Sequence, residues 1–156
     1  MPERGEILEI GKSRVLFEGS DVAILSFGAH MGECIKAAGL MEENGVTVTM
    51  VDARFAKPLD MALIRRLVSH HKAVVTVEQG SRGGFGAMVL HELANQGLLD
   101  GRCQLRTVTL PDRYVDQAAP DAMYADAGMT AVDIAATAME AAGTVLAGVK
   151  SGADQA

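Results

Sequence analysis

The residues VVTVEQGSRGGFGAMV, positions 74–89, decide the fold of this chain. A β-branched run ends at Glu78, four glycines lie between Gln79 and Ala87, and an apolar pattern at helical spacing resumes through His91 and Leu93. This is the pattern of a strand, a tight loop and a helix. In a parallel α/β sheet such a loop lies at the carboxyl end of its strand, where ligands or partners meet the sheet.

The loop has two interpretations. Backbone N–H groups around Gly83, Gly84 and Gly86 could attract an anion at a helix N-terminus, with Arg82 beside them. Alternatively, the glycines supply positive φ and close packing, while Glu78 and Arg82 form a polar loop that faces another domain. The spacing is not GxGxxG and no GK[ST] follows, so we favour the second interpretation.

Composition restricts the class of protein. At 156 residues, 49% hydrophobic and 22% charged, the chain is expected to form about one globular domain. A net charge of −6, no tryptophan and 4% aromatic residues predict no nucleic-acid partner. Cys34 and Cys103 have no CxxC partner, and we expect reduced thiols of a cytoplasmic protein. The polar start and the lack of a long apolar run predict no export signal and no membrane contact.

The ends of the chain are expected to lie outside the domain. Residues 1–6 are interpreted as a linker, 7–147 as one domain and 148–156 as a disordered tail. Near the start, Ile7–Ile10 and Val15–Glu18 flank Gly-Lys-Ser, which predicts a hairpin at one edge of the sheet.

Strands and helices then alternate. Strands are predicted at 22–27, 46–51, 73–77 and 104–110, and helices at 29–44, 60–71, 85–95 and from 130 onward. Asp60 and Thr130 are the expected N-caps of two helices. In the first helix, Met31, Ile35, Ala38 and Met41 recur at core spacing. The predicted fold is α/β, a three-layer α/β/α sandwich around a mostly parallel mixed sheet with an antiparallel edge strand.

Three loops should converge at the carboxyl end of this sheet: residues 52–60, 78–86 and 111–116. A catalytic interpretation would take Glu78 as a general base and Arg54 or Arg82 as an anion clamp. No nucleophile–histidine pair accompanies these groups, so we favour a polar surface between domains, with no catalytic, cofactor-binding or metal-binding residue. The candidates for inter-domain or anion contact are Arg54, Lys57, Glu78, Arg82, Gly83, Gly84, Asp112 and Arg113.

The histidines have ordinary structural interpretations. His30 enters a helix, where a capping or solvated group is expected. His70 and His71 end a helix, where a cation complements the dipole. His91 lies within an apolar helical pattern and is expected in the core or at its boundary.

Four ordered motifs together resemble a known family. They are LSFG at 25–28, DARFAKPLD at 52–60, VTVE with GGFG between 75 and 86, and LPDRY at 110–114. They resemble the carboxyl-terminal domain of transketolase-like thiamine enzymes, most closely the 1-deoxy-D-xylulose-5-phosphate synthases, from about Ile7 to Ala142. The chain has Gln79 and Ala87 where such relatives usually have an acid and a serine. The β subunits of 2-oxo acid dehydrogenases share the fold and the loop.

The resemblance implies the third of three domains, with thiamine diphosphate and Mg²⁺ bound by the first two. No GDG motif is present, so no cofactor is expected in this domain. Its partners would be the N-terminal and middle domains of the same enzyme, in a homodimer. The whole enzyme would convert pyruvate and glyceraldehyde 3-phosphate to 1-deoxyxylulose 5-phosphate and CO₂, for isoprenoid and thiamine synthesis. Two alternatives stay open: an independent small-molecule or anion-binding regulatory module, and a 2-oxo acid dehydrogenase β subunit.

Overall fold

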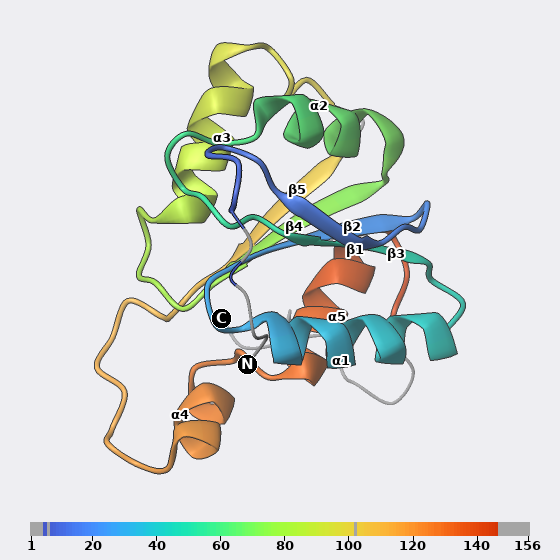
Figure 1. Ribbon diagram of the computed structural model, residues 1–156. Coiled ribbons are helices and arrows are strands. Elements are labelled where there is room, and N and C mark those ends of the chain that lie inside the picture. Colours follow the sequence, from blue (N-terminus) through green and yellow to red (C-terminus); the bar gives the residue numbers. More distant parts are fainter. Residues whose placement is uncertain (1–4, 6, 102, 147–156) are drawn as a thin grey trace.

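One mixed five-stranded sheet carries helices on both of its faces (Figure 1). The computed structural model describes residue 5, residues 7–101 and residues 103–146. The predicted tail at 148–156 and the predicted linker, apart from Gly5, lie outside the described residues. In chain order the elements are β1 Arg14–Phe17, β2 Val22–Phe27, α1 Met31–Glu43, β3 Val48–Asp52, α2 Met61–His70, β4 Ala73–Glu78, α3 Phe85–Asn95, β5 Gln104–Val108, α4 Pro120–Asp126 and α5 Ala131–Ala141.

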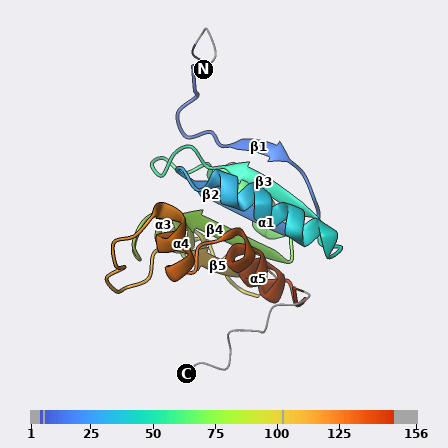
Figure 2. The same cartoon turned by 90° about the horizontal axis from the view of Figure 1, so that it is seen from below.

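The strand order is β1-β3-β2-β4-β5, which Figure 2 shows from below. Strands β3, β2, β4 and β5 are parallel, with Val22 level with both Val48 and Ala73. All six residues of β4 are buried, as expected for a near-continuous apolar strand covered on both faces. The three-layer fold predicted from the alternation of strands and helices is confirmed.

The first strand is antiparallel, but the predicted hairpin is wrong. β1 pairs with β3, where Arg14 lies opposite Asp52, and residues 7–10 form no strand. Ile7 and Ile10 are exposed, so this segment does not bury its apolar side chains against the sheet. β1 instead pairs with the free edge of β3, and this long-range pairing forms the predicted antiparallel edge strand.

Two apolar clusters lie on the two faces of the sheet. α1 and α5 cover one face, with Ile24, Met50 and Val75 beneath them, and α2 and α3 cover the other. In α1 the buried residues are Cys34, Ala37, Ala38 and Met41, whereas Ile35 is exposed. The buried face of α1 is therefore rotated about the helix axis relative to the predicted one. Small residues on this helix face α5 across a close contact.

Local signals set the helix ends. The Asp60 carboxylate accepts from the Leu63 N–H, and Thr130 with Asp133 forms a capping box at the start of α5, so both predicted N-caps are confirmed. Helix α4 has no buried residue. It stands apart from the sheet at the lower left of Figure 1, on the long connection that follows β5.

Candidate functional site

The three predicted loops meet around Gly83. This glycine lines one cavity together with residues 56–59 and a second together with residues 109–111. The loop after β4 thus lies between the β3–α2 loop and the segment after β5. Parallel strands deliver all three to the same edge of the sheet, as the sequence predicts.

Glu78 at the end of β4 points inward. It is 4% exposed, and its Oε2 and Oε1 accept from the backbone N–H groups of Phe85 at 2.9 Å and Gly86 at 2.8 Å. Gly84, the N-cap of α3, has no side chain to satisfy these amides, so Glu78 caps the helix and complements its dipole. The sequence placed Glu78 on a polar loop that faces another domain, whereas this carboxylate is engaged inside the domain.

The glycines of the loop are required for different structural reasons at different positions. Gly83 has a φ of +94°, which glycine adopts without strain. Gly84 has a φ of −83°, and its requirement is space, because a Cβ there would collide with the Glu78 carboxylate. At Gly86 a Cβ would lie 2.6 Å from Thr76 Oγ1, so this glycine brings α3 close to the sheet. These observations bear out positive φ and close packing.

Arg54 folds back on the end of β3. Its backbone has a φ of +58°, the one positive value for a non-glycine residue in the described chain. Its N–H donates to Asp52 Oδ1 at 3.1 Å, and its Nε lies 3.9 Å from Asp52 Oδ2. The side chain is mostly buried. The carboxylate of Asp52 thereby stabilises a left-handed turn that costs about 1 kcal/mol or more.

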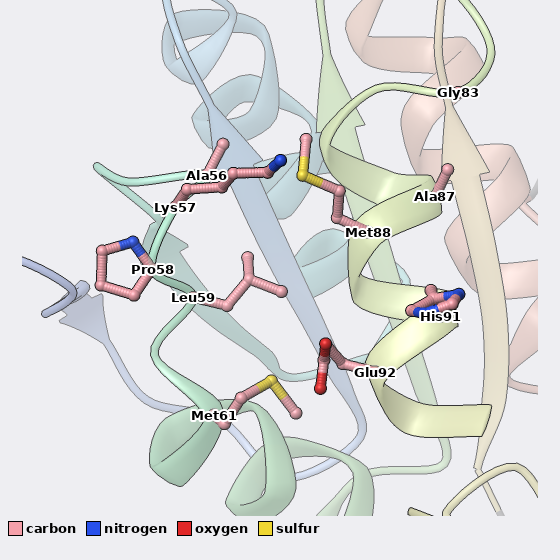
Figure 3. Close-up of a pocket in the computed structure, with 10 residues that line it drawn as sticks. All are labelled: Ala56, Lys57, Pro58, Leu59, Met61, Gly83, Ala87, Met88, His91 and Glu92. Carbon is pink, nitrogen blue, oxygen red and sulfur yellow. The ribbon is translucent and has the colours of Figure 1, made fainter. Parts of the chain in front are cut away.

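Lys57 stands at the rim of a groove between the β3–α2 loop and α3, with a volume of about 660 Å³ (Figure 3). Leu59 and Met61 point into it from one wall and Met88 from the other. His91 also lines this groove and is exposed. The expectation of a core or boundary histidine is therefore wrong, because His91 lies on the side of α3 that lines the groove, whereas Val89 and Leu93 face the sheet.

Arg82 and Asp112 are exposed. Arg82 borders the second cavity, of about 490 Å³, beside Leu110 and Pro111. Arg113, by contrast, is held by Asp126. Its guanidinium donates to the carboxylate of Asp126 at 2.8 Å and to its carbonyl at 2.7 Å, and this contact lowers the pKa of the Asp126 carboxyl. Arg113 thus joins the loop after β5 to α4.

Sequence reasoning missed a polar cluster around the buried His30. Its Nε2 lies 2.6 Å from the Met129 carbonyl oxygen, and its Nδ1 lies 3.2 Å from the Gln79 amide nitrogen, which also reaches the Tyr124 hydroxyl at 2.5 Å. Because the amide donates to Nδ1, the ring hydrogen is on Nε2 and donates to Met129. The expectation of a capping or solvated histidine is wrong. The bonded partners lie 49 and 99 positions away, so no local pattern could reveal them.

This cluster lies at the switch point of the sheet. β2 and β4 are neighbours, yet the helices that follow them, α1 and α3, cover opposite faces. In open α/β sheets the ligand crevice lies at this position. Here His30, Gln79 and Tyr124 line a cavity of about 430 Å³ and bond to one another. The polar side chains that line the crevice thus hydrogen-bond to one another.

Nucleophilic and metal chemistry have little support in the described residues. Burial raises the thiol pKa of both Cys34 and Cys103 to about 11, which keeps them protonated near neutral pH. Within residues 5, 7–101 and 103–146, no group of three or more His, Cys, Asp or Glu side chains could hold a metal ion. In the same residues, no helix is both long enough and apolar enough to span a bilayer.

Sequence comparison gives one domain family and several relatives. The model described as "Transketolase, C-terminal domain" matches residues 11–134. The chain is 59% identical over 143 residues to 1-deoxy-D-xylulose-5-phosphate synthase 2 of Jannaschia sp. (strain CCS1), covering 92% of this chain. It is 58% identical over 142 residues to 1-deoxy-D-xylulose-5-phosphate synthase of Rhodobacter capsulatus, covering 91%. The chain spans 22% of the length of each relative.

Solved structures share the fold. One described as a split gene transketolase, an inactive β4 tetramer, matches with a TM-score of 0.78 and 29% identity, over 88% of this chain and 44% of that one. A transketolase variant from Pichia stipitis matches with a TM-score of 0.61 at 14% identity, over 85% of this chain and 18% of that one. At that identity the second match supports the fold alone.

Proposed function

This chain belongs to the transketolase C-terminal domain family, and from that premise we propose that it is the carboxyl-terminal domain of a thiamine-diphosphate-dependent 1-deoxy-D-xylulose-5-phosphate synthase. One observation carries the proposal: 58–59% identity to two such synthases over more than nine-tenths of this chain. The longer enzyme would join pyruvate to glyceraldehyde 3-phosphate with loss of CO₂, supplying isoprenoid and thiamine synthesis.

We propose that the cofactor binds outside this domain. The amides of Phe85 and Gly86, which could otherwise bind a diphosphate at a helix N-terminus, donate to Glu78. The described residues also hold no cluster suited to Mg²⁺. We therefore assign thiamine diphosphate and Mg²⁺ to the preceding domains, where the cofactor would carry the chemistry. The same two amides argue against an anion-binding module that uses the glycine loop.

The role left to this domain is assembly. Lys57, Arg82, Gly83 and Asp112 lie on exposed loops at one edge of the sheet, which is where we place the contact with the N-terminal and middle domains. Gly84 and Arg54 shape these loops from within. We propose that the longer enzyme is a cytoplasmic homodimer. Two free cysteines are compatible with a reducing compartment, and homo-oligomers most often form two-fold dimers.

A chimeric enzyme tests the proposal. The region of the Jannaschia synthase that matches this chain is replaced by this chain, and 1-deoxyxylulose 5-phosphate is measured with pyruvate and glyceraldehyde 3-phosphate as substrates. We expect activity in the chimera and none in the 156-residue chain alone or in the synthase truncated before this region. A folded chimera that forms no product would overturn the proposal.

A further inference from the structure

The groove between the β3–α2 loop and α3 is apolar and uncovered. Leu59 and Met61 form one wall, and Ala87 and Met88 form the other, all partly exposed (Figure 3). Within the described part of the chain, no other segment fills the volume of about 660 Å³. Apolar side chains gathered around such a hollow mark a contact with another molecule or domain.

Charge is distributed unevenly along this groove. Lys57 and Gly83 lie toward one end, and Glu92 lies toward the other (Figure 3). Neither Lys57 nor Arg82, the residue before Gly83, forms an ion pair with the described residues. The carboxylate of Glu78 in the same loop is turned inward to α3. Lys57 therefore gives one end of the groove a positive charge that has no ion-pair partner among the described residues, although the chain as a whole carries a charge of −6.

The occupant follows from the length of the relatives and from this charge. The chain matches a carboxyl-terminal domain and spans 22% of the synthases it resembles, so most of a homologous polypeptide precedes it. We propose that the groove receives a segment of those preceding domains, in which an apolar side chain enters between Leu59 and Met88 and a neighbouring carboxylate pairs with Lys57. This inference rests on the proposed function and names the surface through which assembly occurs.

Two other occupants fit the groove less well. A two-fold contact between copies of this domain, centred on the groove, would set one hollow against another and leave both without a side chain that fills them. A small-molecule site needs polar groups that converge on the ligand, whereas here Lys57 and Glu92 stand at opposite ends of an apolar hollow. An apolar anchor with a charged neighbour satisfies both features.

Photo-crosslinking in the chimeric enzyme tests the assignment. Benzoylphenylalanine replaces Met88 in the groove or, as a control on the opposite helical layer, the exposed Ile35 of α1. We expect position 88 to crosslink to the preceding domains, at an apolar residue next to Asp or Glu. Lys57→Glu should lower this yield at least about tenfold, the scale of losing a partly desolvated charge pair. Arg106→Glu, an equal charge reversal on β5, should leave it unchanged.

Three results would overturn the proposal. They are crosslinks from position 88 only to a second copy of this domain, no crosslink in a folded chimera, and an unchanged yield with Lys57→Glu. Hydrogen exchange needs no substitution and covers the case of a misfolded variant. Amides of residues 56–61 should exchange several-fold more slowly in the chimera than in the isolated chain, and equal exchange would likewise contradict the inference.

The outcome for the groove is separate from the outcome for the proposed function. An active chimera whose groove is neither protected nor crosslinked would support the proposed function and refute the assignment of the groove as a contact surface. A chimera that forms no product, yet crosslinks position 88 to the preceding domains, would refute the reaction and keep the contact surface.

Discussion

A single carboxylate decides what the glycine loop can do. Glu78 ends a fully buried strand, and its two oxygens accept from the first two amides of α3. A helix that starts at glycine would otherwise leave these donors unsatisfied in the interior, at about 1–3 kcal/mol each. The residue that could have served as a base or an exposed contact is thereby used to join strand and helix.

Replacing Glu78 should destabilise the protein. Glu78→Ala leaves the Phe85 and Gly86 amides without acceptors, and we expect the free energy of unfolding to fall by about 2–4 kcal/mol. Glu78→Gln keeps one acceptor oxygen and should cost roughly half as much. Urea denaturation measures both. An equal cost for the two variants would show that the hydrogen bonds to α3 do not carry the effect.

Gly84 should be sensitive to a side chain only while Glu78 is present. Its φ is negative, so conformational strain is not the obstacle, and the Cβ of Gly84→Ala would meet the Glu78 carboxylate. We expect a loss of about 1–3 kcal/mol in the natural sequence and a much smaller additional loss in a Glu78→Ala background. Independent, additive costs in this double-mutant cycle would contradict the steric explanation.

At the scale of elements, the amino ends of three parallel strands are held by one ion cluster. Asp21 precedes β2, Thr47 precedes β3 and Lys72 precedes β4. The Asp21 carboxylate accepts from Lys72 Nζ at 2.8 Å and from Thr47 Oγ1 at 2.6 Å. These hydrogen bonds, the one from Lys72 first, hold the pKa of Asp21 well below its usual value. The cluster fixes the strand ends opposite to the candidate site.

This cluster predicts a loss of stability in acid. Because the pKa of Asp21 is lower in the folded state, its stabilisation is present above the unfolded pKa of about 3.9 and is lost as pH falls toward the folded value. Asp21→Asn should reduce the free energy of unfolding by about 1–2 kcal/mol at pH 7, and the difference should shrink below about pH 4. Glu18→Gln, which breaks an exposed pair with Arg66, is the control and should cost under about 0.5 kcal/mol. A difference for Asp21→Asn that stays constant with pH would exclude the ionised pair as its source.

Elements were predictable where their signals are local. The parallel strands read as apolar runs, and Asp60 and Thr130 mark helix starts by short-range hydrogen bonds. The pairing of β1 with β3 and the burial of His30 depend on residues far along the chain, and no window of sequence contains both partners. The loops of the candidate site were placed correctly by topology. The inward orientation of Glu78 was not predicted. An acidic residue before a glycine loop is as compatible with an exposed side chain as with a buried one.

At the scale of the whole molecule, the two ends of the sheet have different tasks. The amino ends of the strands are locked by Asp21, Thr47 and Lys72. The carboxyl ends carry a polar crevice lined by His30, Gln79 and Tyr124 and, farther along, an open apolar groove. In the crevice, where α/β domains commonly bind ligands, these three side chains hydrogen-bond to one another. The uncovered apolar groove supports the proposal that this domain binds a protein segment.

The same arrangement predicts that the 156-residue chain does not bind thiamine diphosphate. Diphosphate sites of this kind combine free amides at a helix N-terminus with a bound metal ion. At α3 the amides donate to Glu78, and the described residues offer no cluster for Mg²⁺. Calorimetry with thiamine diphosphate and Mg²⁺ should show no binding to this chain up to about millimolar ligand, which corresponds to a binding free energy weaker than about −4 kcal/mol. The chimeric enzyme should bind the cofactor at micromolar concentration.

Glu78→Ala provides a sharper form of the test, because it frees two amides at the helix N-terminus. If that variant acquires affinity for inorganic phosphate while the natural chain has none, the carboxylate is what excludes anions from the loop. Micromolar binding of the cofactor by the natural chain would instead place cofactor recognition in this domain.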